Sequence, residues 1–282
     1  MKQAAAIETI DETQLLQRWI ACLLSRGGIG KSLFDEAFIS WLRFAGVPYG
    51  AVDADPQNRT LSNRYKDHVR FFDAAKNESE FLRYMTTMPE HPVVVTDFPA
   101  QATDNLLGYA EQYGLIDFLK KKRIRPTLII FAADDPAVQL SASDVVKFFR
   151  EAADYVLVEN PARFESEGFR RTKLAKYLVN ECHAPTISMP AIAAPTVAAW
   201  EALERKAKVY LPVDEICAQE GLHDLSRHEL ARFRDKMHAQ FEQNARWLLP
   251  DLSLVKNKVP ALAPLKIRPK SDRLTDSWLD TD

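Results

Sequence analysis

The chain has 282 residues, of which 46% are hydrophobic and 27% charged, values typical of a folded globular protein. Its formal net charge of −2 at pH 7 excludes a strong overall attraction to nucleic acid or anionic membrane, so such a partner would need a local basic patch. The three cysteines are far apart and fit no metal-binding spacing. Because no run of 18 apolar residues and no secretory leader occurs, we expect a cytoplasmic protein without a membrane anchor.

Six short apolar runs have the composition of buried β-strands. They are 19–24, 48–52, 92–96, 127–132, 155–158 and, with the weakest signal, 186–189. Segments with helical spacing lie between them, such as 33–45, closed by Gly46, and 144–153. Strands rich in Val, Ile and Leu that alternate with helices predict an α/β fold with a mostly parallel, doubly wound sheet.

After about residue 195 the pattern predicts helices only. One helix is expected to begin at Pro195 and to reach about residue 210. A second is expected to begin at Ser226, which forms a capping box with Glu229, while Leu225 and Leu230 are placed as a hydrophobic staple. An apolar stripe follows at helical spacing, and packing on the sheet is favoured over a partner surface: Leu230, Phe233, Met237, Phe241 and Ala245.

These patterns divide the chain into four parts. We expect an N-terminal extension (1–18), a core with the sheet (19–195), C-terminal helices that pack on the core (196–249) and an extended or disordered tail (250–282). The 18 residues before the first strand are too few for a helix-turn-helix, which disfavours sequence-specific operator binding.

The segment SRGGIGKS, residues 25–32, has the composition of a phosphate-binding loop. It follows an apolar run and precedes an amphipathic helix, which is the context such a loop needs. Gly27, Gly28 and Gly30 supply permissive backbone, Lys31 a cation for the β- and γ-phosphates and Ser32 a hydroxyl for Mg²⁺. The first glycine of the common GxxxxGK[ST] pattern is missing, because Ser25 stands in its place.

Acidic residues end two of the other predicted strands. Asp53 and Asp55 stand in VDADPQNRT (52–60), and Asp97 follows the run VVVT. Because the carboxyl ends of parallel strands meet at one edge of a sheet, these acids are expected to face the phosphate loop. An acid at the position of Asp97 can hold Mg²⁺ through water, opposite the serine of the loop.

Together these motifs resemble the ParA/MinD family of deviant Walker A P-loop ATPases. SRGGIGKS resembles the family pattern KGGxGK[ST], DADPQ resembles its DxDPQ segment, and TDFPA resembles its DxPP Walker B motif, with Ala100 in place of the second proline. The order and approximate spacing agree, and the resemblance covers residues 19 to about 195. It implies a P-loop NTPase fold in which the missing first glycine marks the deviant subclass.

The resemblance also implies roles for individual residues. Asp55 would position or activate the attacking water, and Asp53 would support the water shell of the metal. ATP and Mg²⁺ are the implied cofactors, and Asn160, which ends the strand YVLVEN, would bind adenine; a plain turn residue before Pro161 is the alternative. The implied nucleotide-binding set is Gly27, Gly28, Ile29, Gly30, Lys31, Ser32, Leu33 and Asn160, and the implied metal set is Ser32, Asp53 and Asp97.

The signature lysine of the family is replaced by Arg26. In the family that lysine reaches the phosphates of the partner subunit in an ATP-sandwiched dimer. Arginine is always charged and binds phosphate as a planar fork, so Arg26 is expected to act as a catalytic finger in an ATP-dependent homodimer. An ATPase activator or another protein partner is also implied.

The biological role implied is plasmid partition, plasmid stability or conjugative transfer, with ATP-favoured, non-specific DNA binding. Two basic clusters could contact DNA phosphates, although a solvated loop and a solvated tail are alternatives: Lys120, Lys121, Lys122, Arg123 and Arg125, and Lys256, Lys258, Lys266, Arg268 and Lys270. Two other functions stay open. One is a nucleotide-dependent adaptor with little hydrolysis, and the other is a small-molecule ligase or kinase on the same scaffold.

Overall fold

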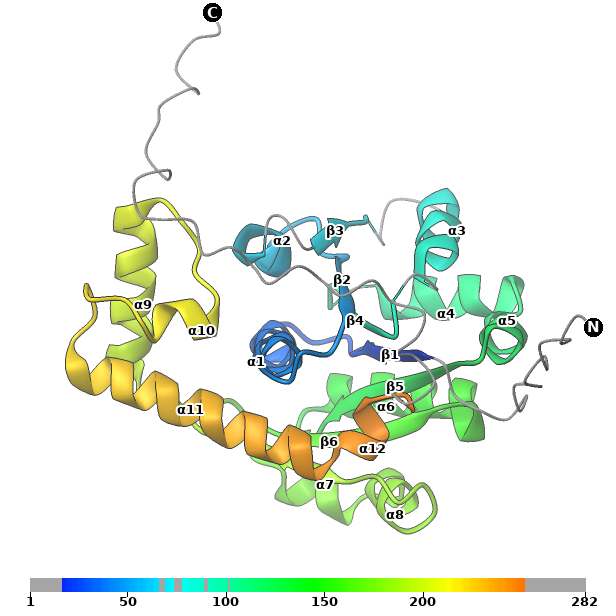
Figure 1. Ribbon diagram of the computed structural model, residues 1–282. Coiled ribbons are helices and arrows are strands. Elements are labelled where there is room, and N and C mark those ends of the chain that lie inside the picture. Colours follow the sequence, from blue (N-terminus) through cyan, green and yellow to red (C-terminus); the bar gives the residue numbers. More distant parts are fainter. Residues whose placement is uncertain (1–16, 66–68, 74–77, 89–90, 101, 252–282) are drawn as a thin grey trace, which may run out of the picture.

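The computed structural model describes residues 17–65, 69–73, 78–88, 91–100 and 102–251 (Figure 1). Seven strands form one sheet: β1 (Gln17–Ala21), β2 (Tyr49–Asp53), β3 (Val69–Phe71), β4 (Val93–Asp97), β5 (Ile124–Phe131), β6 (Asp154–Glu159) and β7 (Thr186–Ser188). Their order is β3-β2-β4-β1-β5-β6-β7, and every neighbouring pair is parallel. Parallel pairing brings the carboxyl ends of all these strands to the same edge of the sheet.

Helices connect the strands and continue after the last one. The helices before β7 are α1 (Lys31–Phe44), α2 (Thr60–Arg64), α3 (Glu78–Thr87), α4 (Thr103–Gln112), α5 (Leu115–Lys122), α6 (Pro136–Phe149), the 3₁₀ turn η2 (Arg150–Ala152), α7 (Glu167–Arg171) and α8 (Lys173–Asn180). Those after it are α9 (Ala194–Ala207), α10 (Val213–Ile216), α11 (Asp224–Gln243) and α12 (Ala245–Leu248).

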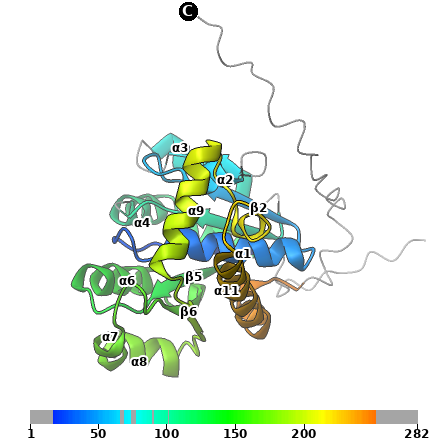
Figure 2. The ribbon, with the colours of Figure 1, turned by 90° about the vertical axis from the view of Figure 1, so that its left-hand side faces the viewer.

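The sheet is covered on both faces. Figures 1 and 2 show α1 with α11 on one face, and α4 and α6 on the other. The chain enters at β1 in the middle of the sheet, builds outward to β2 and β3, returns through β4 and then builds toward β7 on the other side. This is the predicted doubly wound, parallel α/β fold.

All six predicted strands are present, and β3 is the strand that the sequence analysis missed. The central strands β1 and β4 are buried along their whole length, which explains the apolar runs 19–21 and 93–95 within them. In contrast, β3 is three residues long and none of them is buried. A short edge strand with no buried residue carries no apolar run by which it could be recognised.

Two predicted helix starts are wrong. Helix α6 begins at Pro136 rather than at residue 144, because the Asp135 carboxylate caps it by accepting from the N–H groups of Ala137 and Val138. Helix α11 begins at Asp224 rather than after Ser226, and its N-cap is His223, whose ring accepts from Leu225 N–H.

The capping box and hydrophobic staple predicted for α11 do not form. Ser226 accepts a hydrogen bond from the Thr196 hydroxyl, and Glu229 accepts one from Ala193 N–H, so both side chains bind the start of α9. Leu225 is 73% exposed, so it does not form the predicted hydrophobic staple. Contacts with a neighbouring helix therefore replace the local cap that the sequence pattern indicated.

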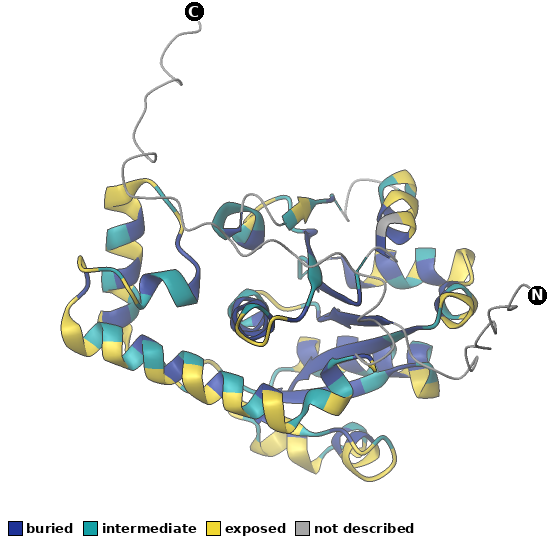
Figure 3. Ribbon diagram, in the orientation of Figure 1, coloured by how far each residue is buried: buried dark blue, intermediate teal, exposed yellow. Residues whose placement is uncertain are grey.

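The predicted apolar stripe of α11 faces α1, as the alternation of buried and exposed residues along this helix shows (Figure 3). Leu230, Phe233, Met237 and Phe241 are all buried. The ring of Phe241 lies 5.4 Å from Phe34 and 5.2 Å from Phe38, as measured between ring centroids. Ala245 falls in α12, beyond the end of α11.

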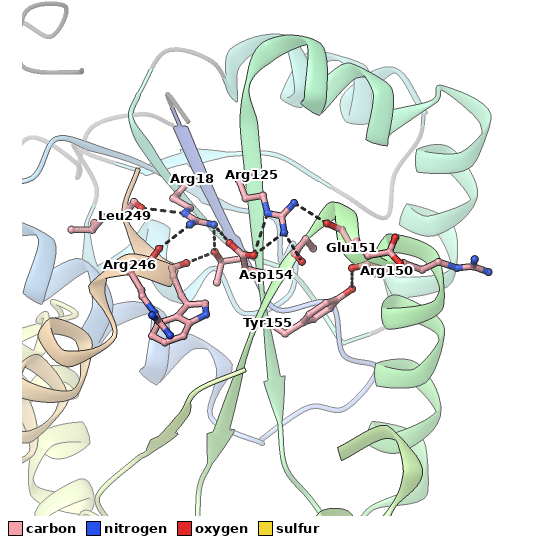
Figure 4. A network of polar contacts seen from close by, with 11 residues as sticks. Arg18, Arg125, Arg150, Glu151, Asp154, Tyr155, Arg246 and Leu249 are labelled. Atoms are coloured by element: carbon pink, nitrogen blue, oxygen red, sulfur yellow. Dashed lines mark hydrogen bonds and ion pairs between the residues drawn. The ribbon is translucent and has the colours of Figure 1, made fainter. Parts of the chain in front are cut away.

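A polar network ties the end of the described chain to the amino ends of β1, β5 and β6 (Figure 4). The buried Arg18 guanidinium pairs with Asp154 and donates to the carbonyl oxygens of Arg246 (2.9 Å) and Leu249 (3.2 Å). Arg125 binds the same carboxylate at 2.8 Å. The described chain therefore ends near the amino-terminal edge of the sheet, opposite to the carboxyl ends of the strands.

No helix in the described part of the chain combines the length and the apolar character that crossing a bilayer requires. The predicted extension and tail lie outside the described residues, apart from residues 17–18 and 250–251. The tail cluster of basic residues belongs to this undescribed part.

Candidate functional site

The loop between β1 and α1 has the backbone conformation of a phosphate-binding loop. Gly28 and Gly30 have φ values of 73° and 107°, a region that residues with a Cβ rarely adopt. At Gly30 an added Cβ would also lie 2.5 Å from Asn160 Nδ2. Helix α1 begins at the next residue, so its unpaired N–H groups point toward this loop.

Lys31 is a buried cation at the start of α1. Only 8% of the residue is exposed, and its Nζ donates to the carbonyl oxygens of Arg26 at 2.9 Å and Leu24 at 3.3 Å. The loop therefore wraps around its own lysine. Neutral carbonyl oxygens do not neutralise a buried ammonium, which leaves Lys31 able to gain from a bound anion.

Ser32 and Asp97 connect the loop to the end of β4. Ser32 Oγ donates to Asp97 Oδ2 at 2.6 Å, as the order β4-β1 in the sheet allows. Burial and the nearby Asp53 carboxylate raise the pKa of Asp97 to about 7, against the opposing effect of the Ser32 hydrogen bond and of Lys31. A divalent cation at this position would favour the charged carboxylate.

The two acids after β2 have different environments. Asp53 is fully buried, and its two oxygens accept from Asp55 N–H at 3.0 Å and Ser62 N–H at 2.8 Å. Burial raises its pKa, although these backbone hydrogen bonds oppose the shift. Such bonds suit a residue that positions the loop and α2, whereas a role in the water shell of a metal stays a prediction.

Asp55 lies at the surface of the site. Its Oδ1 accepts from Gln57 N–H at 2.8 Å and Asn58 N–H at 3.2 Å, and its Oδ2 accepts from Asn58 Nδ2 at 2.9 Å. The carboxylate thus organises the turn of residues 55–58 while it remains open to the cavity described below. This is the placement expected of a group that orients water.

Asn160 and Arg163 approach the loop from the end of β6. Asn160 Nδ2 donates to Ile29 O at 2.9 Å, so its amide donor is used by the phosphate loop, and the predicted adenine contact stays a prediction. Arg163 is exposed and follows in the turn closed by Arg163 N–H to Asn160 O at 2.9 Å. Sequence analysis missed Arg163, and its place three residues after a strand-end asparagine is the signal that could have found it.

Most of these groups line one cavity of about 460 Å³, a volume suited to a small molecule. It is bounded by the phosphate loop, by the segments after β2 and β4, and by the turn after β6: Gly27, Gly28, Gly30, Lys31, Ser32, Leu33, Asp55, Pro56, Gln57, Asn58, Asp97, Phe98, Pro99, Ala100, Ala102, Asn160 and Arg163. The cavity thus brings together most of the predicted site. Of the predicted residues, Arg26, Ile29 and Asp53 are not among those that line it.

Arg26 is not among the residues that line the cavity. Its side chain is 52% exposed, and Nε lies 3.4 Å from Asp135 Oδ2 at the start of α6. The guanidinium is therefore paired within the chain. Its predicted contact with a partner subunit would require this ion pair to open.

The residues present fit a magnesium–nucleotide ligand. The described residues contain no cluster of three His, Cys, Asp or Glu side chains able to hold a metal by themselves. Magnesium commonly binds through one or two protein oxygens together with substrate phosphates and water, and Ser32 and Asp97 offer such a pair beside the loop.

Sheet order, phosphate loop and strand-end acids define the chain as a P-loop protein of the α/β class. No family model matches the sequence. No curated protein matches it either.

Solved structures with a similar fold include MinD of Aquifex aeolicus, alone and in the MinC:MinD cell division protein complex. Each is 12% identical, with a TM-score of 0.45; the alignments cover 80% of this chain and 97% and 96% of those chains. A third is a "putative plasmid partition protein" of Borrelia burgdorferi B31 bound to AMPPNP, 14% identical, with a TM-score of 0.41 and coverage of 81% and 99%. The assignment of the class rests on the geometry above.

Proposed function

We propose that the chain is a ParA/MinD-like ATPase switch that binds Mg²⁺–ATP and hydrolyses it slowly. One observation carries the proposal: a single cavity joins the phosphate loop, Asp55 and Asp97, which stand in three sequence motifs far apart along the chain. Each motif alone is a weak signal. Their meeting at the carboxyl edge of a parallel sheet, where such folds bind ligands, supports a nucleotide site.

In this proposal the loop N–H groups and Lys31 hold the β- and γ-phosphates, while Ser32 and Asp97 hold the metal. Bound Mg²⁺ would neutralise charge on the phosphate oxygens. Asp55 orients the attacking water at the rim of the cavity. Asp53 fixes the loop that carries Asp55. Asn160 and Arg163 follow β6, on the other side of β1 from the strands that carry the acids, and would contact the base.

We further propose a role in plasmid partition, plasmid stability or conjugative transfer, with ATP-favoured homodimerisation and non-specific DNA binding. The support is the motif resemblance together with the exposed lysines Lys120, Lys121 and Lys122 at the end of α5. We also propose that the protein is cytoplasmic and that a protein partner activates its ATPase.

A second candidate is a nucleotide-dependent adaptor that hardly hydrolyses ATP. The pairing of Arg26 with Asp135 favours it, because a finger that is bound within its own chain does not reach the nucleotide of a partner. In that case α9 to α11 would be the surface that a protein partner recognises.

Calorimetric titration with Mg²⁺–ATP tests the proposal through Lys31→Ala. We expect a loss of affinity of about 100-fold or more, because charge-assisted contacts to two phosphates disappear. Lys147→Ala, which removes an exposed lysine of α6, is the matched control and should bind as the wild type does. Full affinity in Lys31→Ala would overturn the assignment of the site.

A further inference from the structure

Arg64, the last residue of α2, is a cation whose side chain contacts α1 and α9. Its side chain is 15% exposed, and it pairs with Glu36 of α1. It also lies 3.3 Å from Glu204 Oε1 of α9, and its guanidinium carbon stands 4.7 Å from the centre of the Trp200 ring of the same helix. Arg64 therefore joins the helix that begins at the phosphate loop, α2 and the C-terminal helices.

The two carboxylates that Arg64 joins are both buried. Glu36 is 1% exposed and Glu204 is 7% exposed. Glu204 Oε1 additionally accepts from Trp200 Nε1 at 2.9 Å and from Leu211 N–H at 2.9 Å. A buried carboxylate that loses its counter-charge is strongly destabilised, so the contact of α2 with α9 resists being broken.

Asp53 links α2 to the turn that lines the cavity. Asp53 accepts from Ser62 N–H within α2 and also from Asp55 N–H, and Asp55 lines the cavity. With five residues, α2 is too short to be stable by itself and depends on the contacts at its two ends. Hydrogen bonds and the short helix therefore connect the turn at residues 55–58 to Arg64 without a break.

We propose that Arg64 is a positioning residue that couples the Asp55 turn to α9, so that nucleotide binding changes the stability of α9 and contacts on α9 change turnover. The inference rests on the proposed ATP site and adds its regulation. When the Asp55 turn closes on the γ-phosphate, it holds α2 in one position. The buried ion pair of Arg64 with Glu204 then holds α9 in the matching position. Because binding linkage is reciprocal, a ligand that stabilises α9 also favours the ATP-bound arrangement.

Amide hydrogen exchange of the full chain, with and without Mg²⁺–ATP, tests this coupling. In the wild type we expect ATP to slow exchange in Ala194–Ala207. Glu204→Gln keeps an oxygen for Trp200 and Leu211 but removes the charge that faces Arg64. The effect of ATP on α9 should disappear in this variant, and kcat should fall about 10- to 100-fold through the misplaced Asp55 turn, with the affinity for ATP kept within about twofold.

Glu201→Gln is the matched control. It lies one turn earlier on α9, is 58% exposed and pairs only with Arg205 at 3.6 Å among the contacts of the described chain, so exchange and kcat should stay as in the wild type. Arg64→Lys is a second variant, which keeps the charge but loses the planar fork that reaches two carboxylates. We expect it to lose the ATP effect on α9 as Glu204→Gln does.

The outcomes separate the two proposals. If calorimetry detects no ATP binding by the wild type, the proposed function is overturned and the coupling with it. If ATP binds but exchange in α9 does not respond, the coupling alone is overturned. The coupling alone is also overturned if Glu204→Gln and Arg64→Lys, when folded, respond to ATP as Glu201→Gln does. Should one of the two variants fail to fold, the other decides by the same criterion.

Discussion

Ser32 Oγ lies 2.6 Å from Asp97 Oδ2, so the hydroxyl at the start of α1 donates a hydrogen bond to the carboxylate at the end of β4. The two residues are 65 positions apart in sequence, and the parallel pairing of β1 with β4 brings them together. Both oxygens are of the kind that Mg²⁺ binds. Under the proposed function, Ser32 and Asp97 would hold the metal together.

Replacing Asp55 should separate nucleotide binding from turnover. In Asp55→Asn the amide oxygen can still accept from Gln57 N–H and Asn58 N–H, so the turn should keep its shape while the negative charge is lost. We expect ATP affinity close to that of the wild type and a hydrolysis rate lower by about 100-fold or more. Phosphate release under saturating ATP measures the effect, and an unchanged rate would move the water-positioning role to another group.

Releasing Arg26 from its ion pair should promote dimerisation with ATP. Asp135→Asn removes the charge that holds Arg26 but keeps an oxygen to cap α6, since Asn and Asp are comparable N-caps. Sedimentation velocity with Mg²⁺–ATP, in the Asp55→Asn background to limit hydrolysis, should show more dimer than the background alone. Arg26→Ala in that background should stay monomeric. A dimer that forms equally well without Arg26 would contradict the role proposed for it.

Asp35 should make the folded protein less stable as the pH rises. Its two carboxylate oxygens are buried and have no hydrogen-bond partner among the described residues, and burial followed by the nearby Asp97 charge raises its pKa well above the usual value. Above pH ~4 the unfolded chain releases this proton while the folded chain keeps it, so stability falls by up to ~1.4 kcal/mol per pH unit until the folded-state pKa is passed.

Urea unfolding of Asp35→Asn at several pH values measures this effect. Because the variant has no proton to release at this position, the difference between its free energy of unfolding and that of the wild type should widen in favour of the variant as the pH rises from 4. Below pH ~4 the slopes should agree. Asp117→Asn, at an exposed position of α5, should show no such divergence. Parallel pH profiles for wild type and Asp35→Asn would refute the prediction.

Triple replacement of Lys120, Lys121 and Lys122 by alanine should weaken non-specific DNA binding in the presence of ATP. These lysines are exposed, whereas Arg125 is 36% exposed and already paired with Asp154. If each lysine contacts one phosphate, the negative slope of log affinity against log salt should become less steep by up to about 2.7. Replacing Lys173 and Lys176 on α8 is the control. If the wild type with ATP retains no DNA at low salt, the adaptor function takes precedence.

The parallel sheet, the phosphate loop and the acids at the strand ends could all be predicted from the amino-acid sequence. Central parallel strands are buried on both faces and are therefore largely apolar, which makes runs such as 92–96 visible without a structure. The loop was recognisable because Gly28 and Gly30 need a backbone conformation that other residues rarely adopt. Both signals are local, so they survive in a one-dimensional pattern.

Which of these polar groups lines the cavity could be learned only from the tertiary structure. Asp53 and Asp55 have the same type of side chain at the same strand end, yet the first binds backbone N–H groups inside the protein and the second lines the cavity. Arg125 likewise proved to be paired with Asp154, and contacts with α9 replace the predicted cap of α11. Arg64 became significant only through Glu36 and Glu204, which are 28 and 140 residues away in sequence. Hydrogen bonds and ion pairs form between whichever groups the fold brings together, and spacing along the chain does not encode those distances.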